Sequence, residues 1–191
     1  MRAAWVLVFV LLLQACVHAP QVPKAANLTQ HDLAQSFVLN GRIAVNHHGE
    51  RSTVSLRWVH KPGSNDILLL APLGITLAHI EHTASGVLLE ASGKQYRSRD
   101  VETLMDDVIG WHLPLDEMYT WAMARPYPQS PFDVESNTNK QIVWLRQDGW
   151  EIRYPRYQSD AEDSLPLKLL LRHNDLDLQL VVDEWELGSH E

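Results

Sequence analysis

The sequence predicts an α+β fold made mainly of β-structure, in which one antiparallel sheet of about eleven strands curves around about two or three helices. Most of the chain alternates apolar and polar residues with a period of two, and short turn signals separate these segments. Only the middle of the chain changes to a helical period. With 191 residues, of which 45% are hydrophobic, the chain is long enough for one domain whose core needs no disulfides.

The alternating pattern defines the expected strands. In the first of them, Phe37 and Leu39 lie on one face and Val38 on the other. The segments with this pattern are residues 37–46, 54–58, 66–71, 75–83, 87–91, 95–98, 142–145, 150–154, 167–172 and 176–182. Asp148-Gly149 is a strong signal for a hairpin turn. Short turns of this kind join antiparallel neighbours, so the expected sheet is a meander.

Two amphipathic helices are expected in the middle of the chain. The first spans residues 101–109, and the second follows Pro114. Each has one apolar stripe at helical spacing. The stripe residues are Val101, Leu104, Met105, Val108 and Ile109 in the first helix, and Leu115, Met118, Trp121 and Ala122 in the second. A further short helix, up to about Ser36, is indicated by the capping pattern Thr29-x-x-Asp32.

A leucine occupies an unusual position in the turn Ala71-Pro72-Leu73-Gly74, which joins two expected strands. Proline at the second position and glycine at the fourth suit a type I turn, with Leu73 at the third position near the tip. Turn tips normally carry polar residues. Leu73 either folds back onto the domain as an apolar plug or stays exposed to contact a lipid or a partner, and the local sequence leaves both interpretations open.

The first residues have the features of a secretion signal. Arg2 precedes an apolar stretch, residues 3–13, which is too short to span a bilayer and has the length of a signal-peptide core. The segment Leu13–Cys16 resembles a bacterial lipobox, and Cys16 is the only cysteine in the chain. This resemblance implies that Cys16 becomes the lipidated first residue of the mature protein. The alternative is an ordinary secretory signal with a chance cysteine.

The residue after the cysteine is Val17, where lipoproteins kept at the inner membrane carry aspartate. The lipobox resemblance therefore implies the outer membrane of a Gram-negative bacterium, with the domain anchored at its periplasmic face by buried acyl chains. The expected organisation is a signal peptide over residues 1–15, a lipid-anchored tether over residues 16–28 and a single domain over residues 29–187.

Charge and motifs argue against several functions. The formal charge of −8 makes nucleic acid an unexpected partner, because phosphate binding requires a basic surface. The sequence contains no nucleophile elbow, P-loop or zincin motif, so it assigns no catalytic residue and no cofactor. On a strand, His79 and Glu81 face one side and His82 the other, so no metal site is expected there. His47 and His48 are expected to be solvated loop residues.

Several motifs, in this order, resemble the LolB family of outer-membrane lipoprotein receptors, and they cover most of the expected domain. The matching segments are Asn40-Gly41-Arg42-Ile43-Ala44-Val45, Trp58, Leu70-Ala71-Pro72-Leu73-Gly74, Gly110-Trp111-x-Leu113-Pro114-Leu115 followed by Trp121, and Asp148-Gly149-Trp150-x-Ile152-x-Tyr154. Members of the family often carry asparagine where this chain has Ala71. That difference affects the hydrogen bonding of the turn but leaves its leucine in place.

The resemblance implies an unclosed antiparallel β-barrel of about eleven strands, whose helices cover a hydrophobic cavity. The cavity would accept the acyl chains of lipoproteins from the periplasmic carrier LolA. The protein, acting as a monomer and without a cofactor, would then insert these chains into the outer membrane. The implied site residues are Pro72, Leu73 and Gly74 in a membrane-insertion loop, and Trp58, Trp121 and Trp150 at the acyl-chain cavity.

Two other interpretations remain open from the residues alone. An outer-membrane-anchored envelope hydrolase would have a cleft with titratable groups of shifted pKa. A structural or assembly lipoprotein would have a packed interior and an exposed apolar patch. A receptor would have a deep apolar pocket without a polar cluster. For each tryptophan, ordinary core packing is an open alternative as well.

Overall fold

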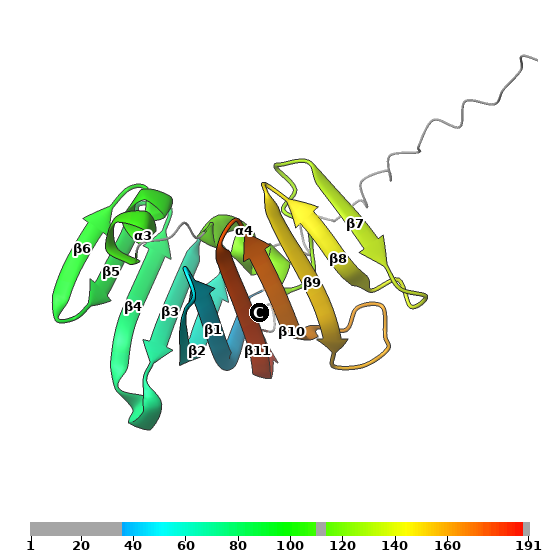
Figure 1. Ribbon diagram of the computed structural model, residues 1–191, viewed down its shortest axis with the longest axis horizontal. Coiled ribbons are helices and arrows are strands. Elements are labelled where there is room, and N and C mark those ends of the chain that lie inside the picture. Colours follow the sequence, from blue (N-terminus) through cyan, green and yellow to red (C-terminus); the bar gives the residue numbers. More distant parts are fainter. Residues whose placement is uncertain (1–35, 110–113, 189–191) are drawn as a thin grey trace, which may run out of the picture.

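The computed structural model describes residues 36–109 and 114–188, and an antiparallel sheet of 11 strands forms most of it (Figure 1). The strands are β1 (Phe37–His47), β2 (Glu50–Lys61), β3 (Ser64–Leu70), β4 (Thr76–Thr83), β5 (Gly86–Ala91), β6 (Lys94–Ser98), β7 (Phe132–Ser136), β8 (Ile142–Gln147), β9 (Trp150–Tyr157), β10 (Pro166–His173) and β11 (Leu176–Leu187). Their order across the sheet is β6-β5-β4-β3-β2-β1-β11-β10-β9-β8-β7. Strands β6 and β7 form the two edges, so the sheet is open.

The first and last strands pair in the middle of this sheet. Strand β1 is antiparallel to both β2 and β11, so two meanders, β1–β6 and β7–β11, join along the β1–β11 pair. The register shifts between Asn40 and Gly41. A Cβ atom on Gly41 would collide with the backbone oxygen of Val181. Only glycine permits this close approach of the two backbones.

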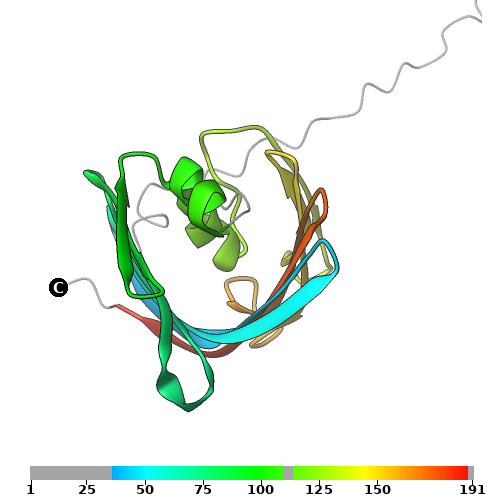
Figure 2. The ribbon, with the colours of Figure 1, turned by 60° about the vertical axis from the view of Figure 1, so that its left-hand side comes forward.

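Two helices lie inside the curve of the sheet (Figure 2). They are α3 (Val101–Ile109) and α4 (Leu115–Ala122). The buried residues on their apolar faces are Val101, Leu104 and Met105 in α3, and Leu115, Met118, Trp121 and Ala122 in α4. These faces and the inner face of the sheet contribute to one hydrophobic core. The helices therefore complete a core that the open sheet alone could not close.

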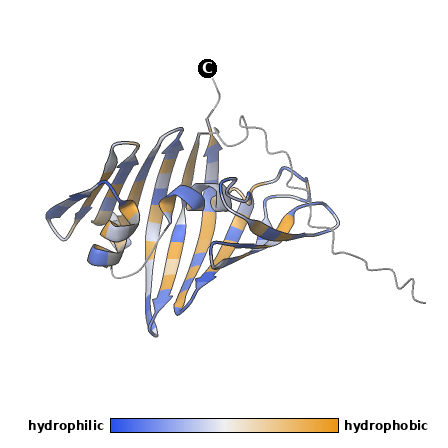
Figure 3. Cartoon of the chain, turned by 90° about the horizontal axis from the view of Figure 1, so that it is seen from above, coloured by the Kyte–Doolittle hydropathy of each residue, from blue (hydrophilic) through white to orange (hydrophobic). Residues whose placement is uncertain are grey.

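The sheet supplies the core with every second residue. In β9, for example, Trp150, Ile152 and Tyr154 are buried, whereas Glu151 is partly exposed and Arg153 exposed. Figure 3 shows the resulting alternation, with hydrophobic residues concentrated on the central strands and hydrophilic residues at the strand ends. One face of each central strand is thus apolar, as expected for a sheet that is covered on one side only.

The predicted fold class is confirmed: the sheet is antiparallel, open and curved around helices that occupy the two predicted positions. The prediction missed the edge strand β7, and it ended several strands too early. Strand β11, predicted over residues 176–182, extends to Leu187, because its ladder with β1 continues through acidic residues that interrupt the apolar alternation.

Several predictions fall outside the described residues. They are the signal peptide, Cys16, the tether, residues 29–35 of the predicted short helix, and the segment 110–113. Within the ranges 36–109 and 114–188, no helix combines the length and the apolar character that a membrane span requires.

Candidate functional site

The β3–β4 hairpin extends beyond the rim of the sheet and carries Leu73 at its tip (Figure 1, Figure 2). The short 3-10 turn η2 (Pro72–Gly74) forms the loop. Two backbone hydrogen bonds close it: Gly74 N–H donates to Ala71 O at 3.1 Å, and Ala71 N–H donates to Ile75 O at 2.8 Å. The Leu73 side chain is 100% exposed, so the plug interpretation is wrong.

The backbone of Leu73 has a conformation that leucine rarely adopts. Its φ is +71° and its ψ is 12°. The third residue of a type I turn has φ near about −90°, so the predicted turn type is wrong at this position. The left-handed region costs an L-residue roughly 1–2 kcal/mol, which glycine or asparagine largely avoids. Leucine at this position is therefore unfavourable for folding, which points to a role outside the fold.

Two further apolar side chains continue from Leu73 along the hairpin. Ile75 is 63% exposed and Leu77 is 45% exposed. We call Leu73, Ile75 and Leu77 the apolar tip. Ile75 and Leu77 fall in the strand predicted over residues 75–83, and no sequence pattern marked them as exposed. Because full burial of one such side chain contributes about 1.5–3 kcal/mol, a tip of this size is a strong candidate for contact with an apolar phase.

The tryptophans singled out from the sequence are all buried in the core. Trp58, Trp121 and Trp150 are 2%, 0% and 1% exposed, respectively. Trp121 of α4 and Trp150 of β9 are neighbours, with ring centroids 5.9 Å apart. Trp58 of β2 packs edge-on against Phe37, at a centroid distance of 5.4 Å. The structure therefore brings Trp121 and Trp150 together, and it places Trp58 elsewhere in the same core.

A buried glutamine attaches α4 to the sheet. Gln147, at the end of β8, is only 2% exposed. Its Oε1 accepts hydrogen bonds from Trp121 Nε1 at 2.9 Å and from the backbone N–H of Tyr127 at 2.8 Å. Its Nε2 donates to the carbonyl oxygens of Tyr127 at 2.6 Å and of Ser130 at 3.1 Å. One side chain thus fixes both an indole of α4 and the loop that follows this helix. A glutamine next to a hairpin turn looks like a surface residue in sequence, so no local signal identifies it.

A second polar contact holds α4 against β2. The His60 ring is 4% exposed and stacks on Tyr119 of α4, with centroids 4.4 Å apart and planes at 10°. Asn65 Oδ1 accepts a hydrogen bond from Trp58 Nε1 at 3.0 Å and lies 2.8 Å from His60 Nδ1. Since the indole N–H can only donate, the Asn65 atom that faces both rings is the oxygen. His60 Nδ1 therefore carries the hydrogen in this contact.

A wide cleft opens beside this stack, with a volume of about 780 Å³. Its lining is polar and aromatic and comes from the β2–β3 and β4–β5 hairpins, from α4 and from the loop after it. The titratable residues in its lining are His60, His82, Arg99, Asp116, Tyr119 and Tyr127. The cleft therefore lies at the boundary between α4 and the sheet.

Burial lowers the pKa of His60, and the hydrogen bond to Asn65 only partly opposes this shift. The neutral ring is thus favoured in the folded state, whereas in the unfolded chain the His60 side chain has its ordinary pKa of about 6.5. The contribution of the neutral His60 to the free energy of unfolding should therefore be complete above this pH. It should be lost as the pH drops below it. We expect wild-type protein to lose more stability between about pH 7.5 and about pH 5.5 than His60→Phe, which retains the ring stack. Urea unfolding at both pH values tests this, and equal losses in the two proteins would contradict it.

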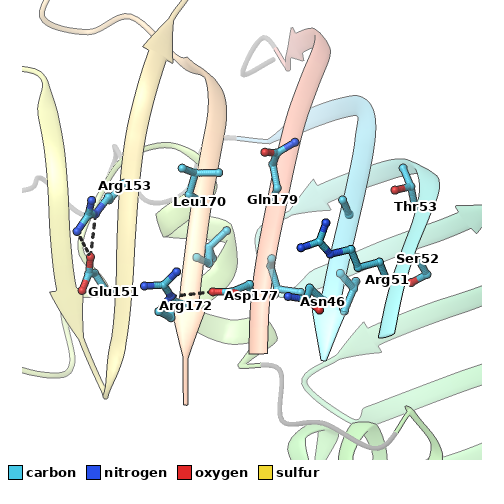
Figure 4. Close-up of a pocket in the computed structure, with 14 residues that line it drawn as sticks. Asn46, Arg51, Ser52, Thr53, Glu151, Arg153, Leu170, Arg172, Asp177 and Gln179 are labelled. Atoms are coloured by element: carbon cyan, nitrogen blue, oxygen red, sulfur yellow. Dashed lines mark hydrogen bonds and ion pairs between the residues drawn. The ribbon is translucent and has the colours of Figure 1, made fainter. Parts of the chain in front are cut away.

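A second hollow lies on the outer face of the sheet, across β9, β10, β11, β1 and β2 (Figure 4). Its volume is about 430 Å³. Arg172 pairs with Asp177 at 2.7 Å and Arg153 pairs with Glu151 at 2.7 Å. A charged groove of this kind does not match the apolar cavity implied by the family resemblance. In the described residues, the strongest concentration of apolar side chains is the core between sheet and helices.

The histidines of β4 lie as the alternation predicts. His79 Nε2 is 3.2 Å from Asp66 Oδ2 and 3.7 Å from Glu81 Oε1 on one face. His82, on the other face, has its Nδ1 3.5 Å from Asp116 Oδ1 of α4. Asp66 comes from the neighbouring strand β3, so the pattern of a single strand could not reveal it.

The interpretation of His47 and His48 as merely solvated loop residues needs correction. His47 is the last residue of β1, and its side chain is only 25% exposed. Both rings approach Asp175 in the β10–β11 turn, with His48 Nδ1 2.7 Å and His47 Nε2 3.8 Å from Asp175 Oδ2. A sequence separation of more than one hundred residues hid this contact.

Comparison with known structures supports the fold. A LolA superfamily protein from Nitrosomonas europaea superposes with a TM-score of 0.52 at 10% identity, over 83% of this chain and 88% of that chain. A DUF1329 family protein from Desulfovibrio piger gives a TM-score of 0.54 at 7% identity, over 82% of this chain and 87% of that chain. At these identities the likeness concerns the fold alone.

Sequence comparison is more specific. Residues 35–185 match the family model described as "Outer membrane lipoprotein LolB". An outer-membrane lipoprotein LolB from Nitrosomonas europaea is 34% identical over 195 residues, covering 96% of this chain and 92% of that protein. A LolB from Chromobacterium violaceum is 31% identical and covers 97% of this chain and 99% of that protein. The predicted resemblance is thus confirmed over nearly the whole chain, which belongs to the LolB family of outer-membrane lipoproteins.

Proposed function

We propose that this protein is an outer-membrane lipoprotein receptor that accepts lipoproteins from the periplasmic carrier LolA and inserts their acyl chains into the outer membrane. It is itself anchored through acylated Cys16, at the periplasmic face, and acts as a monomer. The proposal assigns it no catalytic residue and no cofactor. The observation that carries it is a strained, fully exposed Leu73 at the tip of a hairpin that extends from an open, apolar-lined sheet.

The acyl chains would occupy the core between the sheet and α4. Trp58, Trp121 and Trp150 give this core a large indole surface with few rotatable bonds, which suits a site that must accommodate chains of variable conformation. In the structure these side chains are packed against core neighbours. Binding would therefore require α3 and α4 to move away from the sheet. The energy of burying acyl methylene groups, about 0.8 kcal/mol each, is the available driving force.

Pro72, Leu73 and Gly74 would then contact the bilayer during release. Ile75 and Leu77 extend the apolar surface behind Leu73, so insertion of the hairpin would bury more than one side chain. A tether at Cys16 keeps the domain close to the membrane, and the tip provides a short apolar contact along which chains can leave. Transfer from carrier to receptor to bilayer is spontaneous if each successive site holds the chains more tightly.

Transfer of cargo is the direct test. An acylated lipoprotein bound to LolA is mixed with the purified domain lacking Cys16, and the two proteins are separated to see which of them holds the cargo. We expect the cargo to move onto the domain. Cargo that stays on the carrier would exclude the receptor function. Trp fluorescence should change on transfer, because the indoles that border the site exchange protein neighbours for acyl chains.

The same experiment separates the two alternative functions. A structural or assembly lipoprotein has a packed interior and an exposed apolar patch, and both features are present here. Such a protein would bind a partner through the apolar tip without accepting acyl chains from the carrier. An envelope hydrolase would release a shortened glycan or lipid product. Cargo transfer without a change in the mass of the cargo would favour the receptor over both.

A further inference from the structure

Two neighbouring hairpin turns bring three potential metal ligands together. His47 ends β1, His48 begins the turn into β2, and Asp175 lies in the turn between β10 and β11. Because His47 of β1 pairs with Leu176 of β11, the two turns are adjacent. One ligand atom from each of the three side chains lies within 4.8 Å of the other two.

We propose that His47, His48 and Asp175 form a binding site for a divalent transition-metal ion of the Zn²⁺ class. Two imidazole nitrogens and one carboxylate oxygen are a common ligand set for zinc, with water in the fourth position. Zinc–ligand distances of about 2.0–2.1 Å place tetrahedral ligand atoms roughly 3.4 Å apart. Here His48 Nδ1 and His47 Nε2 lie 2.7 Å and 3.8 Å from Asp175 Oδ2, distances on either side of this spacing.

The backbone of the turn explains why two consecutive histidines can share one partner. In a straight strand, the side chains of His47 and His48 would point to opposite faces. His48 and Gly49 instead have φ of +50° and +83°, both in the left-handed region, and together they form the two-residue turn that reverses the chain. The two rings lie side by side as a result, with centroids 4.1 Å apart.

Charges of both signs lie near the cluster, and the cation among them in β2 is Arg51, the cross-strand partner of Asn46. The chain has a formal charge of −8, and Glu50 is the cross-strand partner of His47 in β2. Arg172, near the other turn, is paired with Asp177 at 2.7 Å. A metal ion would take one unprotonated nitrogen from each of the two neighbouring imidazoles.

A second cluster, Asp66, His79 and Glu81, provides an internal comparison. It has only one imidazole, which lies between two carboxylates as in an ordinary ion pair. The shallow pocket that contains Asp66 and Glu81 is also lined by Arg57 and Lys61, whose charges oppose a cation. The first cluster is therefore the stronger candidate, and the second is a matched control.

A metal ion at the first cluster would connect the two meanders of the sheet. Each of the two turns closes a hairpin that contributes one strand to the central β1–β11 pair. An ion held by both turns would cross-link the end of this pair. Because it binds the folded chain and not the unfolded one, it should raise the melting temperature.

The test measures zinc binding by the full chain, purified in detergent without a histidine tag, in competition with a chromophoric chelator. We expect one zinc ion per chain and a rise in melting temperature. His48→Asn, which tolerates the left-handed turn, and Asp175→Asn should each weaken binding by about tenfold or more, since even outer-shell partners of a metal contribute about 10–100-fold. Cys16 is common to all these proteins, so differences between them report on the cluster.

His79→Gln should bind zinc as tightly as the wild type does. The proposal is overturned if the wild-type chain binds no zinc, if His48→Asn and Asp175→Asn bind it as tightly as the wild type, or if His79→Gln abolishes binding. Far-UV circular dichroism of each variant checks the fold. Both substituted turn residues are exposed, so folding should be unchanged.

Discussion

Replacing Leu73 with glutamate should leave folding intact and allow the protein to receive cargo, but should reduce delivery to liposomes by about tenfold or more. The side chain is 100% exposed, so its loss removes no contact within the domain. Stability should therefore change by only about 0.5 kcal/mol. Delivery should fall because burial of a leucine side chain in hydrocarbon favours insertion of the tip by about 1.5–3 kcal/mol, whereas a carboxylate opposes it. Urea unfolding, transfer from the carrier and transfer to liposomes measure the three steps separately.

Two control variants make this prediction specific to Leu73. Leu73→Asn removes the same apolar group but suits the left-handed backbone, so it should gain up to about 1 kcal/mol of stability while losing delivery. Leu187→Glu alters another exposed leucine, 48% accessible, and should deliver cargo normally. If Leu73→Glu unfolds the domain, or delivers cargo at the wild-type rate, the insertion role of the tip is excluded.

Leu73→Asn is expected to raise stability and to lower delivery because the backbone of residue 73 is left-handed, which the sequence did not reveal. The sequence identified a leucine at a turn tip, but its turn chemistry suggested an ordinary type I conformation. The left-handed φ of Leu73 became visible only in the structure. Turn type depends on how two strands of fixed register meet, so residue preferences at four positions do not determine it.

Local sequence patterns predicted helices and strands well wherever one face of the helix or strand was buried. The helix stripes and the alternating strands follow directly from periods of 3.6 and 2, and apart from β7 they gave the order of elements from residue 37 onward. Strand β7 was missed because it is a short edge strand, in which Phe132 and Val134 are only partly buried. Contacts between distant segments were also inaccessible, as the approach of Asp175 to His47 and His48 illustrates.

Gln147 is the clearest example of a residue whose contacts with distant segments the sequence does not reveal. Replacing it with leucine should destabilise the domain by about 3–5 kcal/mol. Leucine has a similar size but cannot accept hydrogen bonds from Trp121 Nε1 and the Tyr127 backbone N–H. It also cannot donate one to the Tyr127 carbonyl oxygen. These groups lie in or beside the core, and each unsatisfied buried group costs about 1–3 kcal/mol. Because binding requires α4 to move and Gln147 holds this helix and its following loop, cargo acceptance should change as well. Urea unfolding and transfer from the carrier measure the two effects.

Gln141 offers a matched control for the functional part of this effect. It is also buried, at 4% exposure, and its Nε2 donates to the carbonyl oxygens of Ser159 and Ala161 at 2.8 Å each. Gln141→Leu should therefore lose a comparable amount of stability. The Gln141 side chain, however, fixes the loop before β10 and makes no hydrogen bond to α4. At a temperature where both variants remain folded, only Gln147→Leu should accept cargo abnormally. Equal acceptance by the two variants would show that the attachment of α4 through Gln147 does not control the site, and that the helix can move without breaking this contact.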